Sequence, residues 1–95
     1  MGLLLSEKQL QSQIVQYAKL RGWRVYHTYD SRRSTAGFPD LVLVRDNHLI
    51  FAEIKSNRGK VTPEQRSWIE ALTRTQCEIH VWRPDDWDYI ETLLA

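Results

Sequence analysis

Residues 37–56 read GFPDLVLVRDNHLIFAEIKS, and this stretch decides the fold. It holds two apolar runs separated by Asp46 and Asn47, residue types that favour a tight turn. We therefore expect a β-hairpin with strands over 41–44 and 49–55. Each strand also brings a carboxylate to a place where a small core would otherwise hold Val or Ile.

The chain before the hairpin predicts a helix and a strand. Residues 6–9, Ser-Glu-Lys-Gln, have the pattern of a capping box, and apolar residues follow at helical spacing. We expect a helix over 7–21, ended by Gly22. Aromatic and β-branched residues then predict a strand over 23–29, and the residues over 30–37 have turn chemistry.

The chain after the hairpin predicts a second helix, a last strand and a short C-terminal helix. Residues 62–65, Thr-Pro-Glu-Gln, combine an N-cap, a proline at the first helical position and a capping-box glutamine. We expect a helix over 63–73, a strand over 78–82, and a final helix capped by Asp85. The resulting order, αβββαβα, is of the α/β class and predicts one mixed sheet flanked by helices.

Length and composition predict a single soluble domain over residues 1–95. The hydrophobic share of 42% is enough for one core, and 95 residues are too few for two. Leu3–Leu5 is far shorter than a signal segment or a membrane span, so we expect no membrane association. The single cysteine, Cys77, cannot form an internal disulfide, which suits the cytoplasm.

Charge is divided unevenly along the chain. The net charge is +1, but residues 84–95 contain four acidic and no basic residues, so the rest of the chain carries +5. A moderately basic body with an acidic tail is able to bind nucleic acid, although this charge alone does not establish it.

The hairpin is expected to bring two carboxylates and an ammonium together. Strand alternation places Glu53 and Lys55 on one face, and counting back from the turn places Asp40 opposite residue 53. Separately, these residues are typical of a surface ion pair and of the start of a strand. Together they suit Mg²⁺ or Mn²⁺ held by Asp40 and Glu53, with Lys55 stabilising negative charge during phosphodiester hydrolysis.

These residues also carry a family resemblance. The stretches Gly37–Asp40, Glu53–Lys55 and Pro63–Arg66, with Gly59 between the last two, resemble the VRR-NUC domain of the PD-(D/E)xK nuclease superfamily. The resemblance covers nearly the whole chain and implies a restriction-endonuclease-like αβββαβ core. It implies that Asp40, Glu53 and the backbone carbonyl of Ile54 bind the metal, and that Lys55 is the catalytic lysine.

Two further residues have both a local and a functional interpretation. Glu7 matches an acidic residue that related nucleases carry on their first helix, where it reaches the metal through water. An acidic residue in the first turn of a helix is also favourable by itself. Gln65 has a local explanation as a capping-box residue, but it shares a helical face with apolar residues, so we expect it to point toward the sheet and the site.

Basic residues flank the acidic cluster in sequence. Arg32 and Arg33 precede Gly37, and Arg58 and Lys60 follow the strand that carries Glu53. Charge runs are usually solvated surface, but beside a phosphodiesterase site we expect them to contact DNA phosphates. No zinc finger or helix-turn-helix pattern is visible, so recognition of shape or backbone is expected instead of base reading.

The resemblance implies a metal-dependent, structure-selective endodeoxyribonuclease of a bacterium or phage, active in the cytoplasm. Free-standing domains of this type resemble Holliday-junction resolvases, so four-way junction DNA is the expected substrate. The alternatives are a flap, nicking or restriction-like nuclease, or a non-catalytic nucleic-acid-binding domain. Symmetric cuts at a junction predict a homodimer, and the chain carries four tryptophans and four tyrosines, residue types that are favoured at interface centres.

Overall fold

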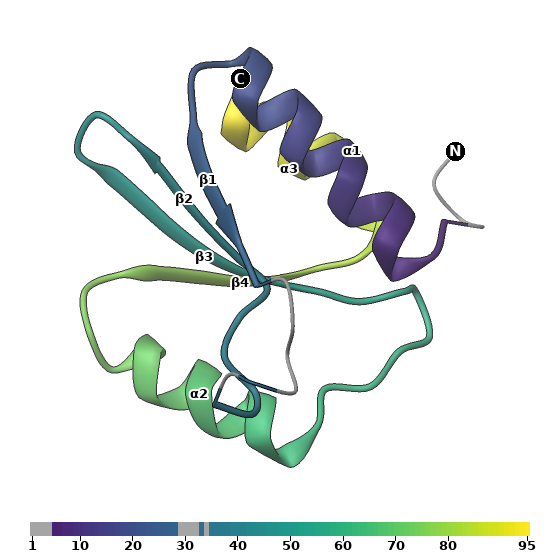
Figure 1. Cartoon of the computed structure of the whole chain (residues 1–95), viewed down its shortest axis with the longest axis vertical. Coiled ribbons are helices and arrows are strands. Elements are labelled where there is room, and N and C mark those ends of the chain that lie inside the picture. The colour runs from purple at the N-terminus through teal and green to yellow at the C-terminus, as the bar shows by residue number, and fades with distance from the viewer. Residues whose placement is uncertain (1–4, 29–32, 34) are drawn as a thin grey trace.

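A four-stranded sheet with helices on both faces organises the protein, as the computed structural model shows for residues 5–28, 33 and 35–95 (Figure 1). This arrangement confirms the predicted α/β class. The strand expected over 23–29 is shorter at both ends, because Trp23 and Thr28 are not part of it, and Tyr29 lies outside the described residues. The elements in chain order are α1 (Glu7–Leu20), β1 (Arg24–His27), β2 (Leu41–Arg45), β3 (His48–Ile54), α2 (Pro63–Thr73), β4 (Glu78–Trp82), the 3₁₀ turn η1 (Pro84–Asp86) and α3 (Trp87–Leu94).

The sheet is mixed and follows the order β1-β2-β3-β4. The first three strands are antiparallel neighbours, whereas β4 pairs parallel to β3 after the crossover through α2. In the β2–β3 hairpin, Leu41 pairs with Ala52 and Arg45 pairs with His48. Asp46 adopts a positive φ of 55° in the turn, a conformation that Asp and Asn tolerate better than most residues.

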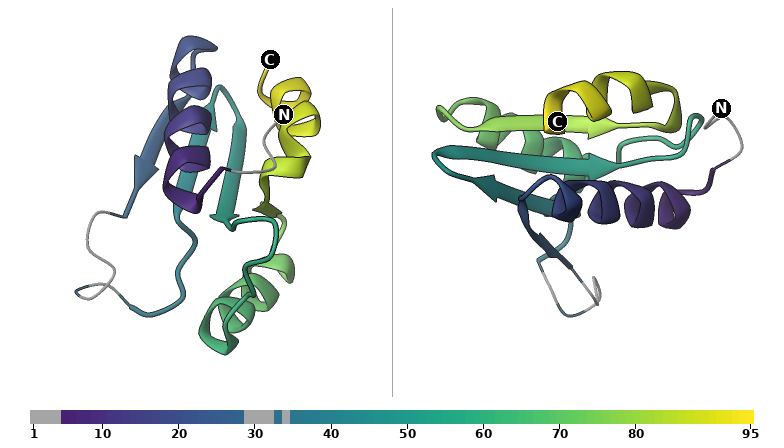
Figure 2. Two further views of the ribbon diagram at one scale, coloured as in Figure 1. Left: turned by 90° about the vertical axis from the view of Figure 1, so that its right-hand side faces the viewer. Right: turned by 90° about the horizontal axis from the view of Figure 1, so that it is seen from above.

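One face of the sheet forms the hydrophobic core with α1 and α3 (Figure 2). The two helices contact each other, since Tyr17 of α1 packs edge-on against Trp87 and its hydroxyl donates to the carbonyl of Glu91, 3.2 Å away. The buried apolar residues of this layer are Leu10, Ile14, Ala18, Trp23, Leu41, Leu43, Ile50, Ala52, Ile54, Trp82, Ile90 and Leu94.

The opposite face is covered by α2 only in part. Phe38 packs edge-on against Phe51 of β3 and against Trp68 of α2 and so links the two elements, while α2 itself contacts β4. Farther along the same face, Tyr26, Val44 and Leu49 are exposed over 62%, 37% and 40% of their surface. Their shared face follows from the pairings Tyr26–Val42 and Val44–Leu49 and from strand alternation. The sheet therefore presents an apolar surface beside α2.

Both predicted capping boxes are present. Ser6 and Gln9 exchange side-chain and backbone bonds at the start of α1, and Thr62 and Gln65 do the same at the start of α2. Gly22, with a φ of +89°, follows the C-cap of α1 as expected.

The predicted cap of the last helix was wrong. Asp85 instead exchanges hydrogen bonds with Asn57, whose side chain donates to the Asp85 carboxylate and accepts from the Asp85 amide. Asp86 closes the turn before α3, because its carboxylate accepts from the amide of Arg83 at 2.9 Å. Asp86 holds the N-cap position of α3, but its side chain makes no capping hydrogen bond to that helix.

No helix in the described part of the chain is long and apolar enough to cross a membrane.

Candidate active site

The hairpin register brings Asp40 beside Glu53. Leu41 pairs with Ala52, so the next residues outward, Asp40 and Glu53, lie opposite each other where the two strands separate. The Asp40 carboxylate accepts a hydrogen bond from the backbone amide of Ile54, with Oδ2 2.9 Å from the nitrogen. The predicted convergence of the two acidic residues is therefore present in the structure.

Glu53 is an acidic side chain buried at the end of β3, with only 2% of its surface exposed. Its Oε2 accepts from the Gln65 amide at 2.8 Å and lies 3.8 Å from Nζ of Lys55. Burial raises the pKa of Glu53 to about 8, and the charge of Asp40, a hydrogen bond with Asp40 and the charge of Glu7 add to the rise, against the lowering effect of Lys55. One ammonium thus does not balance the acidic groups that meet here.

Lys55 is also buried, at 6% exposure, although it lies just past the end of β3. Strand alternation directs it to the same face as Glu53, as the sequence predicted. A buried lysine–carboxylate pair contributes little net stability, because removing both charges from water offsets their attraction. A buried titratable group with a shifted pKa, as Glu53 has, is in contrast typical of functional sites.

Gln65 makes both of the contacts that its position suggested. Its Oε1 accepts from the backbone amide of Thr62 and closes the capping box, while its Nε2 donates to Glu53. The capping bond fixes which end of the amide faces the sheet. The first turn of α2 therefore orients a hydrogen-bond donor toward the buried carboxylate.

Gly37 allows the segment that carries Asp40 to pack against the start of α2. It has a φ of +90°, and a Cβ atom at this position would lie 2.4 Å from the carbonyl carbon of Glu64 and 2.7 Å from the amide nitrogen of Gln65. Both the backbone conformation and the close approach exclude a side chain. The glycine of the motif thus has a structural function: it brings Asp40 and Gln65 to the same end of the sheet.

Glu7 lies at the edge of this cluster. A Cβ atom placed on Gly59 would lie 3.3 Å from Oε2 of Glu7, 3.0 Å from the Ser56 hydroxyl and 3.5 Å from Cδ of Lys55. The first turn of α1 and the loop after β3 therefore meet next to Lys55. The charge of Glu7 raises the pKa of Glu53, although Glu7 itself is exposed.

Comparison with known proteins agrees with this geometry. A family model described as the VRR-NUC domain matches residues 3–85. The chain belongs to the VRR-NUC domain family. A solved structure described as a "VRR_NUC domain protein" aligns with a TM-score of 0.72 over 95% of this chain and 85% of that one, at 20% sequence identity, and shows the shared fold. A search of curated proteins finds no match.

Membership of the VRR-NUC family makes the chain a nuclease domain and raises the question of a metal ion. The described residues contain no group of three or more His, Cys, Asp or Glu side chains arranged to hold one. Two carboxylates nevertheless suit Mg²⁺ or Mn²⁺, which take oxygen ligands and retain several waters. The donor set fits such an ion, because a cation between Asp40 and Glu53 would relieve the repulsion that raises the pKa of Glu53.

Three of the four basic residues expected to contact DNA are described, and all three lie outside the helices and strands. Arg33, Arg58 and Lys60 are exposed, and Arg32 lies outside the described residues. Arg58 and Lys60 belong to the loop that begins directly after Lys55. Arg58 and Lys60 therefore lie close to the buried lysine in sequence, and both are on accessible surface.

Arg83 is a residue that the sequence patterns did not single out. Its Nη1 donates to the carbonyl oxygens of Ser56 and Gly59, each at 2.7 Å, and holds the loop that follows the Lys55 strand. The partners are backbone carbonyls 27 and 24 residues away in the chain, so no local spacing signals the contact.

Proposed function

We propose that this VRR-NUC domain is a metal-dependent endonuclease that hydrolyses phosphodiester bonds in branched DNA, with a four-way junction as its preferred substrate. The observation that carries the proposal is the buried Glu53, which contacts Lys55 and Gln65 and whose pKa is raised partly by Asp40. A non-catalytic binding domain has no need of a buried glutamate and a half-buried aspartate beside a buried lysine.

Each residue of the cluster has a distinct role in this proposal. Asp40, Glu53 and the carbonyl of Ile54 would hold Mg²⁺ or Mn²⁺. The bound ion supplies polarisation of a phosphoryl oxygen and lowers the pKa of water. Lys55 places its ammonium where negative charge develops on the phosphoryl group. Gln65 orients Glu53 through the 2.8 Å hydrogen bond, and Glu7 adds a carboxylate at the edge of the site.

Binding of the DNA backbone is assigned to the exposed arginines and lysines around this cluster. Arg58 and Lys60, together with Arg32 and Arg33, would pair with phosphates without reading bases. Neutralising Arg58 and Lys60 together should weaken DNA binding and reduce its salt dependence to a similar extent for different sequences.

The proposed active form is a homodimer, because resolving a four-way junction requires two matched cuts and one chain supplies one cluster. The exposed apolar surface of Tyr26, Val44 and Leu49 on the open sheet face supports this proposal, since a second copy would bury it.

A substrate panel tests the proposed function. Labelled four-way junction, flap, nicked, duplex and single-stranded DNA are incubated with the protein and with Mg²⁺, Mn²⁺ or EDTA. The proposal predicts cleavage of the junction at symmetric positions with either metal and none with EDTA. Preferred cleavage of flaps or nicks would replace the junction assignment, and an absence of cleavage on every substrate would overturn the proposed enzyme.

A further inference from the structure

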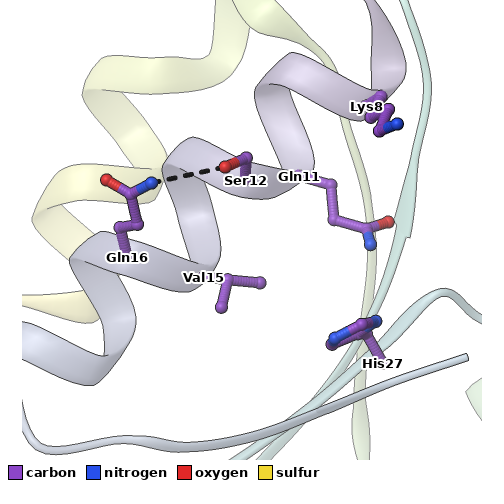
Figure 3. A pocket seen from close by; sticks show the side chains of 6 residues that line it. All are labelled: Lys8, Gln11, Ser12, Val15, Gln16 and His27. Carbon is purple, nitrogen blue, oxygen red and sulfur yellow. Dashed lines mark hydrogen bonds between the residues drawn. The ribbon is translucent and has the colours of Figure 1, made fainter. Parts of the chain in front are cut away.

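A pocket outside the acidic cluster lies between α1 and β1, with a volume of about 250 Å³ (Figure 3). Gln11 projects from α1 toward the strand residue His27, and Lys8 and Val15 lie on the same side of the helix. At the far end of the pocket, Gln16 donates to the Ser12 hydroxyl at 3.4 Å. The lining residues are Lys8, Gln11, Ser12, Val15, Gln16 and His27.

The chemistry of this pocket is opposite to that of the acidic cluster. None of the described residues that line it is acidic, and all of these but Val15 can donate a hydrogen bond. Lys8 adds a permanent positive charge at one end. Val15 and the aliphatic stems of the long side chains supply apolar surface. This combination suits a ligand with an anionic group and an apolar part, such as the sugar–phosphate unit of a nucleic acid.

Both walls of the pocket begin at residues next to the acidic cluster. Lys8 directly follows Glu7, whose charge acts on Glu53. On the other wall, His27 pairs with Leu41, the residue after Asp40. The amide of the next residue, Thr28, donates to the Asp40 carbonyl at 3.3 Å. His27 and Leu41 lie on the face of the sheet that packs against α1, whereas Glu53 lies on the face covered by α2. A strand whose phosphate is cleaved at Asp40 and Glu53 would therefore pass around this end of the sheet to enter the pocket.

Helix stability does not account for Lys8. It lies in the first turn of α1, where the helix dipole favours acidic and disfavours basic side chains. A lysine in the last turn, such as Lys19, is favourable for the same reason. The cation at the start of α1 is thus placed against the local electrostatic preference and beside a pocket of hydrogen-bond donors.

We propose that the pocket binds the DNA sugar–phosphate unit adjacent to the cleaved phosphodiester bond. Lys8 pairs with the phosphate, Gln11 and His27 donate hydrogen bonds to it, and Val15 contacts the deoxyribose. The inference rests on the proposed nuclease function and extends it by naming how the flanking nucleotide is held. These residues bind the substrate and take no part in the chemical step.

The first test measures DNA affinity apart from cleavage. Lys8→Gln and His27→Ala are made in the Asp40→Asn background, and binding to labelled junction DNA is followed by fluorescence anisotropy in EDTA at several salt concentrations. Lys8→Gln should weaken binding about 5- to 10-fold at low salt and reduce the salt slope by about one. Lys19→Gln, on the same helix but outside the pocket, is the matched control and should retain both values.

The second test locates the contact on the DNA. Phosphates around the cleaved bond are replaced one at a time by uncharged methylphosphonates. The Asp40→Asn parent protein should bind the DNA more weakly when the methylphosphonate stands at one position next to the cleaved bond. The same replacement should cause no further loss of affinity in the Lys8→Gln variant. Equal binding by Lys8→Gln and Lys19→Gln, or identical methylphosphonate profiles for the parent and Lys8→Gln, would overturn the proposal.

The experiments distinguish a failure of the proposed nuclease function from a failure of the proposed pocket. A wild-type protein that binds DNA without cleaving it would overturn the proposed nuclease, while the anisotropy comparison would still decide whether the pocket contacts phosphate. A protein that cleaves the junction but shows no effect of Lys8→Gln on affinity would retain the nuclease and lose the pocket. Thermal melts of each variant establish that it is folded during both tests.

Discussion

Burial of Glu53 suits its proposed role at the site but opposes folding when the carboxylate is ionised. Its pKa of about 8 means that the metal-free protein holds it largely protonated at neutral pH, whereas the unfolded chain ionises it near its ordinary value of 4.5. Between pH 4.5 and about pH 8, folding is therefore accompanied by uptake of a proton at Glu53. The metal-free protein must lose stability as the pH rises from about 4.5 to about 8, because the unfolded state is increasingly favoured by ionisation.

Glu53→Gln should remove this pH dependence, since glutamine keeps the shape but cannot ionise. In EDTA at pH 8 the variant should be more stable than the wild type by at least ~1 kcal/mol, which corresponds to a rise in Tm of roughly 4–8 °C. At pH 4.5 the difference should largely disappear. Thermal melts of both proteins at the two pH values provide the measurement, and a Tm difference that does not change with pH would contradict the assignment.

Substitutions can separate the contact of Gln65 with Thr62 from its contact with Glu53. Gln65→Glu retains a side chain that can complete the capping box but loses the amide donor to Glu53. Cleavage should fall about 10- to 100-fold, as is usual for groups that orient a metal ligand. The matched variant Thr62→Ala removes the cap and should lower the free energy of unfolding by about 1 kcal/mol while leaving cleavage close to wild type.

Single-turnover cleavage rates and thermal melts of Gln65→Glu and Thr62→Ala distinguish the two roles of Gln65. If both variants lost activity in proportion to stability, Gln65 would be a capping residue and no more.

At the scale of the elements, Gly37 joins the start of β2 to the start of α2. Gly37→Ala should both destabilise the fold and lower the cleavage rate, because the added Cβ would lie 2.4 Å from backbone of Glu64 and would separate Asp40 from Gln65. The expected loss of unfolding free energy is at least about 1 kcal/mol. Urea denaturation and cleavage assays on the same preparation measure the two effects.

Gly22→Ala is the matched control for Gly37→Ala. Gly22 has nearly the same φ, +89°, but its added Cβ would meet only Cδ of Arg45, at 3.8 Å. It should lose stability from backbone strain and keep its cleavage rate. Equal cleavage by both variants would show that the approach of Gly37 to α2 does not matter for the site.

The elements themselves could be predicted because their signals are local. Each capping box specifies a helix start within four residues, and the symmetric turn of the hairpin fixes which residues face each other. That register was sufficient to bring Asp40 opposite Glu53. The bounds of α2 and β4 were also predicted as the structure has them.

The contacts that could not be predicted connect distant parts of the chain. Arg83 binds carbonyls of the loop after β3, Asp85 pairs with Asn57, and Gly37 packs on the backbone of α2. None of these partners is related to the other by strand or helix periodicity. The contact with Asn57 is why Asp85 does not cap the last helix, and the pocket between Lys8 and His27 likewise joins distant parts of the chain.

At the scale of the whole molecule, the proposed homodimer would use the open face of the sheet. Leu49→Asp introduces a charge into the exposed apolar surface that it shares with Tyr26 and Val44, and it should shift the proposed dimer to a monomer. Junction cuts should then become unpaired, although each site remains intact. Leu20→Asp on α1, where the wild-type leucine is 80% exposed, is the control and should stay dimeric.

Sedimentation velocity at micromolar concentration, with and without junction DNA, measures this directly. A wild-type protein that remains a monomer in both conditions would remove the basis for symmetric junction cleavage and favour a flap or nick substrate.

The central claim is that Asp40, Glu53 and Lys55 form a nuclease centre, and its most direct test is cleavage of a labelled four-way junction by wild type, Asp40→Asn, Glu53→Gln and Lys55→Ala. All four proteins are assayed with Mg²⁺ and with Mn²⁺ after thermal melts have shown that each is folded. The account predicts paired cuts by the wild type and no cleavage by any of the three variants. A folded variant that cleaves at close to the wild-type rate would contradict it.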